Sequence, residues 1–194
     1  IGPLTIWNGR NWRTVISDRR IYIEDMLVSG TSIFFSGGNY DTGLHSLYEV
    51  NLLDFTVTII GSTPDFIHCF EIVGDWIYVG GNFAQVENTG TPLAARWNIR
   101  SRQWEGIPGF GPVTGYVTGI TSFVYIPGFS YLYVNGEFPL ANGCSECYNS
   151  PAQIDLQSKA VSKLNYTMTS LYSFIPSARG GVAVGSNSSG QSGI

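Results

Sequence analysis

The chain has 194 residues, of which 43% are hydrophobic, 14% aromatic and only 12% charged, and its formal net charge is -4. Ten scattered lysines and arginines form no dense basic patch, so nucleic acids are excluded as favoured partners. The apolar runs are shorter than the ~18 residues of a membrane-spanning helix, so no membrane insertion is predicted. The chain begins at Ile1 without a methionine or a signal pattern, which predicts a processed product or a segment of a longer protein.

A hairpin motif opens the chain and returns three times. The apolar run 4–7 ends at Asn8, and a second short strand begins near Trp12. The later copies end at an asparagine or aspartate and resume with an apolar residue, at Asn51 and Phe55, Asn98 and Trp104, and Asp155 and Val161. An apolar run, a polar turn and a second strand are typical of a tight β-hairpin.

A second motif alternates with this hairpin. It is an aromatic strand that ends in small residues, at Gly37-Gly38, Gly80-Gly81, Asn135-Gly136 and, in a faded copy, Gly185-Ser186. Each such strand is predicted to pair with the strand before it across a short turn, as 66–73 pairs with 76–83 across Gly74-Asp75. The motif returns at intervals close to the ~40–50 residues of one propeller blade.

Together the two motifs define a repeated unit of four antiparallel strands. The prediction is a half unit at 1–16, whole units at 17–60, 61–107 and 108–164, and a half unit at 165–194, all within one domain or part of one. Such an array predicts an all-β fold, a β-propeller of four-stranded antiparallel blades with about four blades' worth of strands. Either the terminal halves join in one sheet and close a four-bladed ring, or the chain is an excerpt of a larger propeller.

The middle unit resembles known propeller repeats. A glycine pair closes an aromatic strand, Arg96-Trp97-Asn98 follows, and Trp104 comes next, an arrangement similar to the kelch repeat. The longer run Tyr78-Val79-Gly80-Gly81-Asn82-Phe83 resembles repeats of secreted propellers in fungal, microbial and protist surface proteins even more closely. This resemblance implies a secreted or cell-surface propeller used for adhesion or scaffolding. It brings no catalytic residue with it.

The repeated glycines and tryptophans are interpreted as structural. Glycine is expected where a strand leaves the sheet, because positive φ or close backbone approach is needed there, at Gly37, Gly38, Gly80, Gly81 and Gly136. Four tryptophans stand at matching places and are expected to pack between neighbouring blades, namely Trp7, Trp12, Trp97 and Trp104. An exposed member of this set could instead form a sugar-binding platform.

Three cysteines are present, Cys69, Cys144 and Cys147. The last two lie in a predicted loop insertion, so a disulfide between them is predicted, with free thiols and half of a zinc site as the alternatives. Cys69 is expected to be a small buried residue of a strand. His68 precedes it, but neighbours in a strand point to opposite faces, which argues against a Cys-His dyad.

Few residues are suited to catalysis or to holding a cofactor. The two histidines are His45, in a predicted loop, and His68, and no metalloprotease, serine-hydrolase, EF-hand or phosphate-loop motif occurs. No catalytic residue, metal ligand or cofactor is predicted. A few carboxylates could meet near a central channel and act as the acid and base of a glycosidase: Glu24, Asp25, Glu71, Asp75 and Glu137. Hydrogen bonding at strand ends, or exposure to solvent, is the simpler interpretation of these residues.

Two N-glycosylation sequons, at Asn165 and Asn187, mildly favour secretion, and Asn165 is the better acceptor because it lies between predicted units. The leading hypothesis is a non-enzymatic, extracellular or cell-surface propeller that binds protein partners or copies of itself. A carbohydrate-active propeller, either a lectin or a glycoside hydrolase, is the alternative because aromatic residues are abundant. An intracellular adaptor of the kelch type ranks third.

Overall fold

A computed structural model of the chain describes residues 3–112, 118–141, 151–164, 170–177, 180–186 and 192–193. Every helix or strand in this described part is a β-strand, which confirms the all-β prediction. The chain divides into two compact units, 1–67 and 68–194. The predicted assignment of all residues to one domain stays a prediction.

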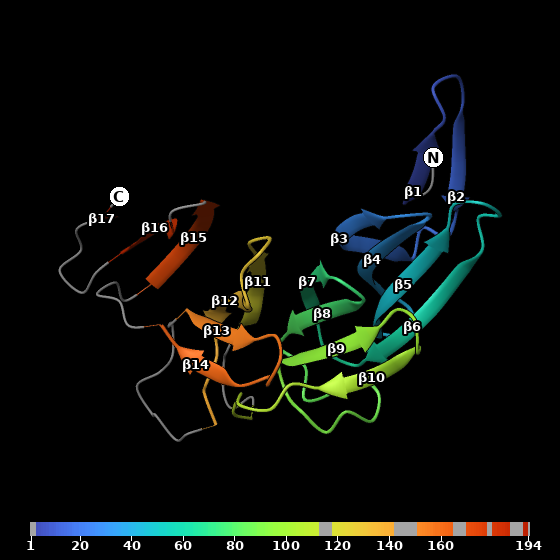
Figure 1. Cartoon of the computed structure of the whole chain (residues 1–194). Helices are drawn as coiled ribbons and strands as arrows, with labels where there is room; N and C mark the ends of the chain where they lie inside the picture. Colours follow the sequence, from blue (N-terminus) through green and yellow to red (C-terminus); the bar gives the residue numbers. More distant parts are fainter. Residues whose placement is uncertain are drawn as a thin grey trace. The chain divides into compact units, whose positions relative to one another are not determined.

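The first unit contains a two-stranded sheet and a four-stranded sheet, both antiparallel (Figure 1). The smaller sheet is the hairpin of β1 (Leu4–Trp7) and β2 (Trp12–Ile16). The larger sheet has the sequential order β3 (Ile21–Ser29), β4 (Ser32–Asn39), β5 (His45–Asn51) and β6 (Val57–Thr63). This sheet is a complete blade, and β6 runs to Thr63, beyond the predicted unit boundary at 60.

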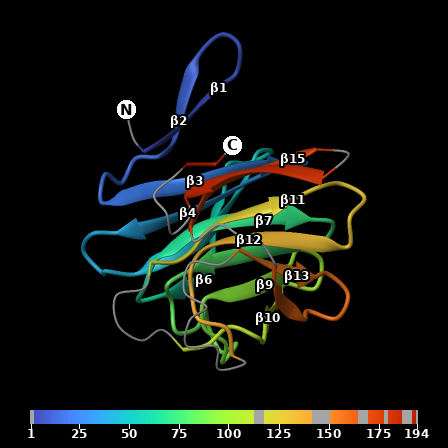
Figure 2. The same ribbon diagram turned by 90° about the vertical axis from the view of Figure 1, so that its left-hand side faces the viewer.

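The second unit contains two further four-stranded sheets and a three-stranded sheet. The first of them consists of β7 (Ile67–Val73), β8 (Trp76–Gly81), β9 (Ala94–Asn98) and β10 (Gln103–Gly106). The second consists of β11 (Gly119–Tyr125), β12 (Tyr131–Glu137), β13 (Ala152–Asp155) and β14 (Val161–Lys163). The third consists of β15 (Ser170–Ser177), β16 (Gly180–Ser186) and the short β17 (Ser192–Gly193). Strand β11 packs on β8 of the preceding sheet. Figure 2 shows β9, β10, β12 and β13 of this unit from another side.

The two terminal half units are separate sheets in the described part of the chain. One is β1–β2, and the other is β15–β17. They belong to different compact units, so closure of a four-bladed ring stays a prediction.

A β-bulge recurs in the first strand of the blades. The register shifts between Ile23 and Asp25, between Ile120 and Ser122, and between Leu171 and Ser173. A bulge places two residues of one strand opposite a single residue of its partner and increases the local twist. In each case the residue before the bulge pairs with a glycine of the second strand: Gly37, Gly136 and Gly185. These three glycines therefore occupy one structural position.

The asparagine or aspartate that ends each third strand forms a side-chain-capped turn. In the second blade, Asn98 Oδ1 accepts hydrogen bonds from the Arg100 and Ser101 N–H groups, at 3.0 and 2.8 Å. Asn8, Asn51 and Asp155 accept equivalent bonds in their own turns. Three of these turns end with a non-glycine residue at positive φ, at Phe55, Arg102 and Lys159. Asx turns of this kind explain the Asn or Asp in the repeat.

Replacing Asn98 with alanine is expected to lower the free energy of unfolding by about 1 kcal/mol, because two turn N–H groups lose their acceptor. Asn98→Asp is the matched control, since the chain itself uses Asp155 at this position. Urea denaturation followed by tryptophan fluorescence measures the difference. Equal stability of the alanine and aspartate variants would contradict the assignment.

Candidate functional site

The hairpin β1–β2 carries an exposed pair of tryptophans. Trp7 and Trp12 are direct partners across the hairpin, and their ring centroids lie 5.3 Å apart with 43° between the ring planes. They are 49% and 69% exposed. The predicted packing of these two rings between blades is wrong. Leu4 and Ile6 point toward the sheet β3–β6 and join its core, whereas Trp7 follows Ile6 and points to the other side.

The equivalent pair in the second unit has a different environment. Trp97 and Trp104 are also direct partners, across β9 and β10. Trp97 is buried, and the guanidinium of Arg102 lies 5.1 Å from the centroid of its ring. Strand β8 pairs with the strand that carries Trp97, and the Arg102 side chain lies over the Trp97 ring. Trp7 and Trp12 have no equivalent of these two neighbours among the contacts described.

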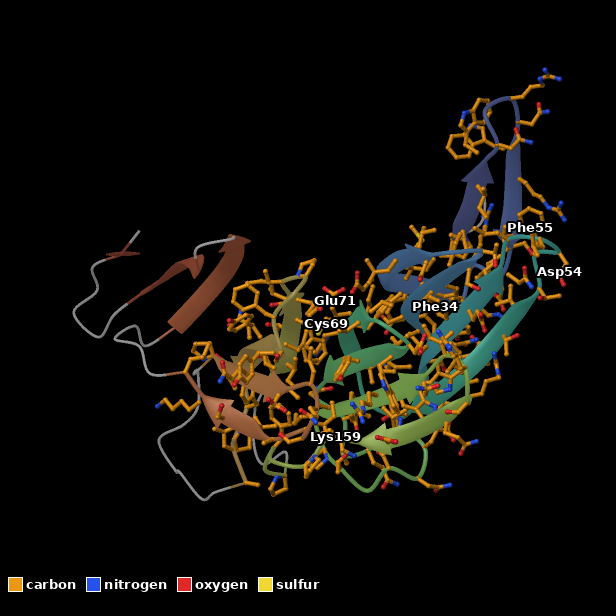
Figure 3. All side chains as sticks on the ribbon, viewed as in Figure 1. Phe34, Asp54, Phe55, Cys69, Glu71 and Lys159 are labelled. Atoms are coloured by element: carbon orange, nitrogen blue, oxygen red, sulfur yellow. The ribbon has the colours of Figure 1, made fainter. Side chains whose placement is uncertain are left out.

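A capped turn joins the two exposed tryptophans. The turn between them is held by Asn8 Oδ1, which accepts the N–H groups of Arg10 and Asn11 at 2.9 and 2.8 Å. Arg13, on β2, places its guanidinium 3.9 Å from the centroid of Phe55, a residue of the turn between β5 and β6 (Figure 3). Arg13 is the direct partner of Ile6, so its side chain points to the side of the hairpin opposite Trp7 and Trp12. We call the surface of Trp7 and Trp12 the tryptophan face. Tryptophan is among the side-chain types most enriched in protein–protein hot spots.

The glycine pairs give room to neighbouring groups. A Cβ on Gly37 would collide with the Tyr22 carbonyl oxygen, and a Cβ on Gly38 would lie 2.5 Å from the Tyr22 hydroxyl. A Cβ on Gly80 would lie 2.9 Å from the Phe123 ring. Gly136 has φ of 146°, and its Cβ would collide with the Gly119 carbonyl oxygen. Close approach therefore explains Gly37, Gly38 and Gly80, and positive φ adds to it at Gly136.

The Tyr22 ring that covers Gly38 belongs to an aromatic cluster. Its hydroxyl lies 3.2 Å from His45 Nδ1, and its ring centroid lies 4.8 Å from that of Tyr40. His45 also packs on Phe66, at 4.0 Å between centroids. Burial, with smaller contributions from Glu24 and Tyr40, raises the pKa of Tyr22. The predicted loop position of His45 is wrong, because this residue is the buried first residue of β5.

A buried arginine organises the second blade. The Arg96 Nε and Nη2 atoms donate to Glu105 Oε2 at 3.1 and 2.8 Å, and its Nη1 donates to the Tyr78 hydroxyl at 3.2 Å. Its guanidinium carbon lies 3.9 Å from the Trp76 ring centroid. Lys159, from the turn after β13, donates to the same Glu105 oxygen at 3.2 Å (Figure 3). This network joins two neighbouring blades of the second unit.

Sequence reasoning missed the Arg96 network, although part of it was accessible. Once the turn 99–102 is assigned, the hairpin register puts Arg96 directly opposite Glu105. Opposite charges at directly paired positions of a hairpin attract each other. The contact with Lys159 carries no such signal, because it depends on how the two blades pack.

Replacing Glu105 with glutamine is expected to destabilise the protein at neutral pH and to have less effect at acid pH. Hydrogen bonds from Arg96, and then from Lys159, hold the pKa of Glu105 below its ordinary value of 4.5. A carboxyl with a lowered folded-state pKa adds stability above its unfolded pKa, and this stability is lost as pH falls through the folded value. Urea midpoints of the native chain and Glu105→Gln should therefore converge below pH 4.5. Asp75→Asn, in an exposed ion pair, is the control.

The candidate acid and base carboxylates of the second unit have separate, local contacts. Glu71 accepts the N–H of Ile72 at 3.0 Å, and Asp75 pairs with Arg100 at 2.9 Å. Glu137 accepts the Thr118 hydroxyl at 3.2 Å. In the first unit, Asp25 accepts the N–H of Met26, and burial raises the pKa of Glu24. Among the described residues no group of three or more His, Cys, Asp or Glu is placed to hold a metal ion.

Several predicted site residues lie outside the described residues: Cys144, Cys147, Asn165 and Asn187. The disulfide and the glycosylation sites therefore stay predictions. Cys69 is buried, and its Sγ lies 3.9 Å from the Gly80 carbonyl oxygen and 3.8 Å from that of Ile120. The described part of the chain contains no helix with the length and apolarity needed to cross a membrane.

The fold has counterparts among solved structures. TolB from Acinetobacter baumannii superposes with a TM-score of 0.59 and 14% identity over 95% of this chain and 43% of that chain. The extracellular domain of a hybrid two-component system from B. thetaiotaomicron has a TM-score of 0.53 and 13% identity, over 88% of this chain and 20% of that chain. This chain thus spans less than half the length of either. The likeness identifies the fold as a β-propeller. No family model and no curated protein matches the chain.

Proposed function

We propose that this chain is a non-enzymatic β-propeller interaction module of an extracellular or cell-surface protein. The tryptophan face is its binding surface for a protein partner. Two exposed, adjacent indole rings carry this proposal, because tryptophan and other aromatic side chains contribute much of the binding energy at typical interfaces.

The geometry favours a protein partner over a flat sugar platform. The indole planes of Trp7 and Trp12 are tilted by 43°, so the two rings form a wedge and not a continuous plane. A wedge fits a pocket of a protein partner. Carbohydrate binding remains the second candidate, because each ring is exposed enough to stack on a sugar.

The extracellular assignment is supported by the sequence. The glycine pair and the Arg96-Trp97-Asn98 run resemble kelch-like repeats of secreted surface proteins, and Asn165 lies in a sequon. One solved structure with a similar fold is itself an extracellular domain. The intact mass of native material tests the assignment. A glycan on Asn165 and loss of two hydrogens for a Cys144–Cys147 disulfide are expected, and unmodified, fully reduced protein would contradict it.

A photo-crosslinking amino acid at position 12 tests the binding surface. In the native setting it is expected to trap a protein partner that the same group at position 40 does not trap, since Tyr40 is equally exposed but lies outside the tryptophan face. Adding Trp7→Ala to the protein with the crosslinking residue at position 12 should abolish this adduct. Equal adducts at positions 12 and 40 would contradict the proposal.

Carbohydrate assays separate the two candidate functions. The interaction module is expected to give no binding on a glycan array and no turnover of a broad glycoside panel. Glycan binding that the Trp7→Ala, Trp12→Ala double variant loses would support the lectin instead. Turnover of glycosides would overturn the non-enzymatic assignment.

A further inference from the structure

The turn that joins β1 to β2 contains an asparagine followed by a glycine. Asn8 and Gly9 lie between the paired residues Trp7 and Trp12. An asparagine side chain is chemically labile, and most of all before glycine, because glycine has no Cβ to shield its own backbone nitrogen. That nitrogen can attack the carbonyl carbon of the asparagine side chain and release the amide as ammonia. The Asn8-Gly9 pair is therefore a candidate site of covalent modification.

The local geometry of the turn favours this reaction. Asn8 and Gly9 are both exposed, and no heavy atom lies within 4 Å of a Cβ built on Gly9, so water and base reach the site. The Asn8 Oδ1 atom accepts the N–H groups of Arg10 and Asn11, at 2.9 and 2.8 Å. These two donors would stabilise the negative charge that develops on Oδ1 as the carbonyl carbon is attacked. All of these contacts lie within the turn itself.

The equivalent turns of the blades do not combine these features. The residue that follows the asparagine or aspartate of each turn is bulky, at Leu52, Ile99 and Leu156. A branched side chain crowds the approach of the backbone nitrogen to the side-chain carbonyl carbon. The glycine therefore sets the turn of the hairpin β1–β2 apart from its counterparts.

A second Asn-Gly pair, Asn135-Gly136, lies inside strand β12. Gly136 pairs with Ile120, and the Asn135 carbonyl oxygen accepts the Thr121 hydroxyl at 3.3 Å. Ring closure requires the backbone to rotate out of the strand conformation, and this pairing opposes the rotation. Asn135 is therefore an internal control for Asn8. A third pair, Asn142-Gly143, lies outside the described residues.

We propose that Asn8 is a deamidation site that limits the lifetime of the tryptophan face. The Gly9 nitrogen loses its proton to solvent and forms a bond to Asn8 Cγ, the bond from Cγ to Nδ2 breaks, and Nδ2 leaves with a proton as ammonia. Water then opens the resulting cyclic imide at either of its carbonyl carbons. Opening at Cγ leaves aspartate at position 8. Opening at the backbone carbonyl carbon leaves isoaspartate, in which the main chain runs through the former side chain.

Isoaspartate is expected to disturb the tryptophan face. It adds an atom to the main chain between Trp7 and Trp12, and it displaces the acceptor that holds the N–H groups of Arg10 and Asn11. The length of a hairpin turn fixes the register of its strands, so the direct pairing of the two tryptophans is expected to be lost. Weaker partner binding follows, and this consequence rests on the proposed function.

Peptide mapping of aged protein tests the chemistry. The folded chain is kept at mildly alkaline pH, digested at acid pH and analysed by mass spectrometry with electron-transfer fragmentation, which distinguishes isoaspartate from aspartate. Conversion at Asn8 is expected to be at least about 10-fold faster than at Asn135. In urea the two rates should converge, because both Asn-Gly pairs are then unfolded. Equal rates in the folded chain, or no conversion at Asn8, would overturn the proposal.

Ageing of the protein with the photo-crosslinking residue at position 12 tests the effect on binding. The partner adduct is expected to decrease in proportion to the isoaspartate formed. Asn8→Ser is the matched control, because a serine hydroxyl can accept a turn N–H but has no amide to lose, so its adduct should survive ageing. A full adduct from protein that contains isoaspartate would overturn the proposed effect on the tryptophan face. If fresh protein forms no adduct, the proposed function fails, whereas the mapping of Asn8 still decides the deamidation.

Discussion

Replacing Gly119 with alanine is expected to cost about 3–5 kcal/mol of unfolding free energy, because two separate penalties add at this residue. Gly119 has φ of 80°, a conformation that residues with a Cβ rarely adopt. The new Cβ would also lie 2.6 Å from the Gly81 carbonyl carbon and 2.7 Å from the Asn82 nitrogen. Those atoms belong to the backbone of the preceding blade, so they cannot rotate away as a side chain could.

Gly74→Ala is the matched control for this prediction. Gly74 has φ of 60°, but no heavy atom lies within 4 Å of its Cβ position. Only the backbone penalty applies there, so a loss of about 1 kcal/mol is expected. Chemical denaturation followed by tryptophan fluorescence measures both variants. Similar losses would show that the close approach of β11 to β8 does not limit which residue fits at position 119.

Replacing Arg96 with methionine is expected to cost about 2–4 kcal/mol, most of it through the partners that lose their donors. The buried Tyr78 hydroxyl loses the bond from Nη1, and Glu105 loses two of its three charged donors. Stacking on Trp76 is lost as well. The estimate lies below the full cost of stranding a buried charge, because Glu105 is partly exposed and keeps Lys159.

Arg100→Met is the control, since Arg100 forms an exposed ion pair with Asp75 in the same hairpin. Such pairs contribute about 0–1 kcal/mol. Arg96→Lys keeps the charge but not the planar fork, so its stability is expected to fall between the native chain and Arg96→Met. If Arg96→Met proves as stable as Arg100→Met, the network does not stabilise the second blade.

Much of the local structure could be predicted from the sequence. The turn at Gly74-Asp75, the hairpin turns that begin at Asn98 and Asp155, and the antiparallel order inside each blade depend on neighbours in the chain. Turns need Asn or Asp for local hydrogen bonds and glycine for positive φ, so these residues recur in the sequence at each turn. The recurring turn residues also identified Trp7 and Trp12, and Trp97 and Trp104, as equivalent pairs.

The environments of these equivalent residues were decided by tertiary structure. The pattern around Trp7 and Trp97 is the same, yet one ring is exposed and the other buried, because burial depends on which strands and side chains lie beside each hairpin. His45 could not be recognised as a buried strand residue, since its partners Tyr22 and Phe66 come from other strands or turns. The bulges before Gly37, Gly136 and Gly185 likewise depend on pairing between strands.

Residues close together in the chain suffice to predict the repeat, the strand order within a blade and the turn chemistry. The folded structure was needed to show which members of each repeated set are exposed and how Lys159 reaches Glu105 from the next blade. These features arise from contacts between residues far apart in the chain, and such contacts leave no periodic signal in the amino-acid pattern.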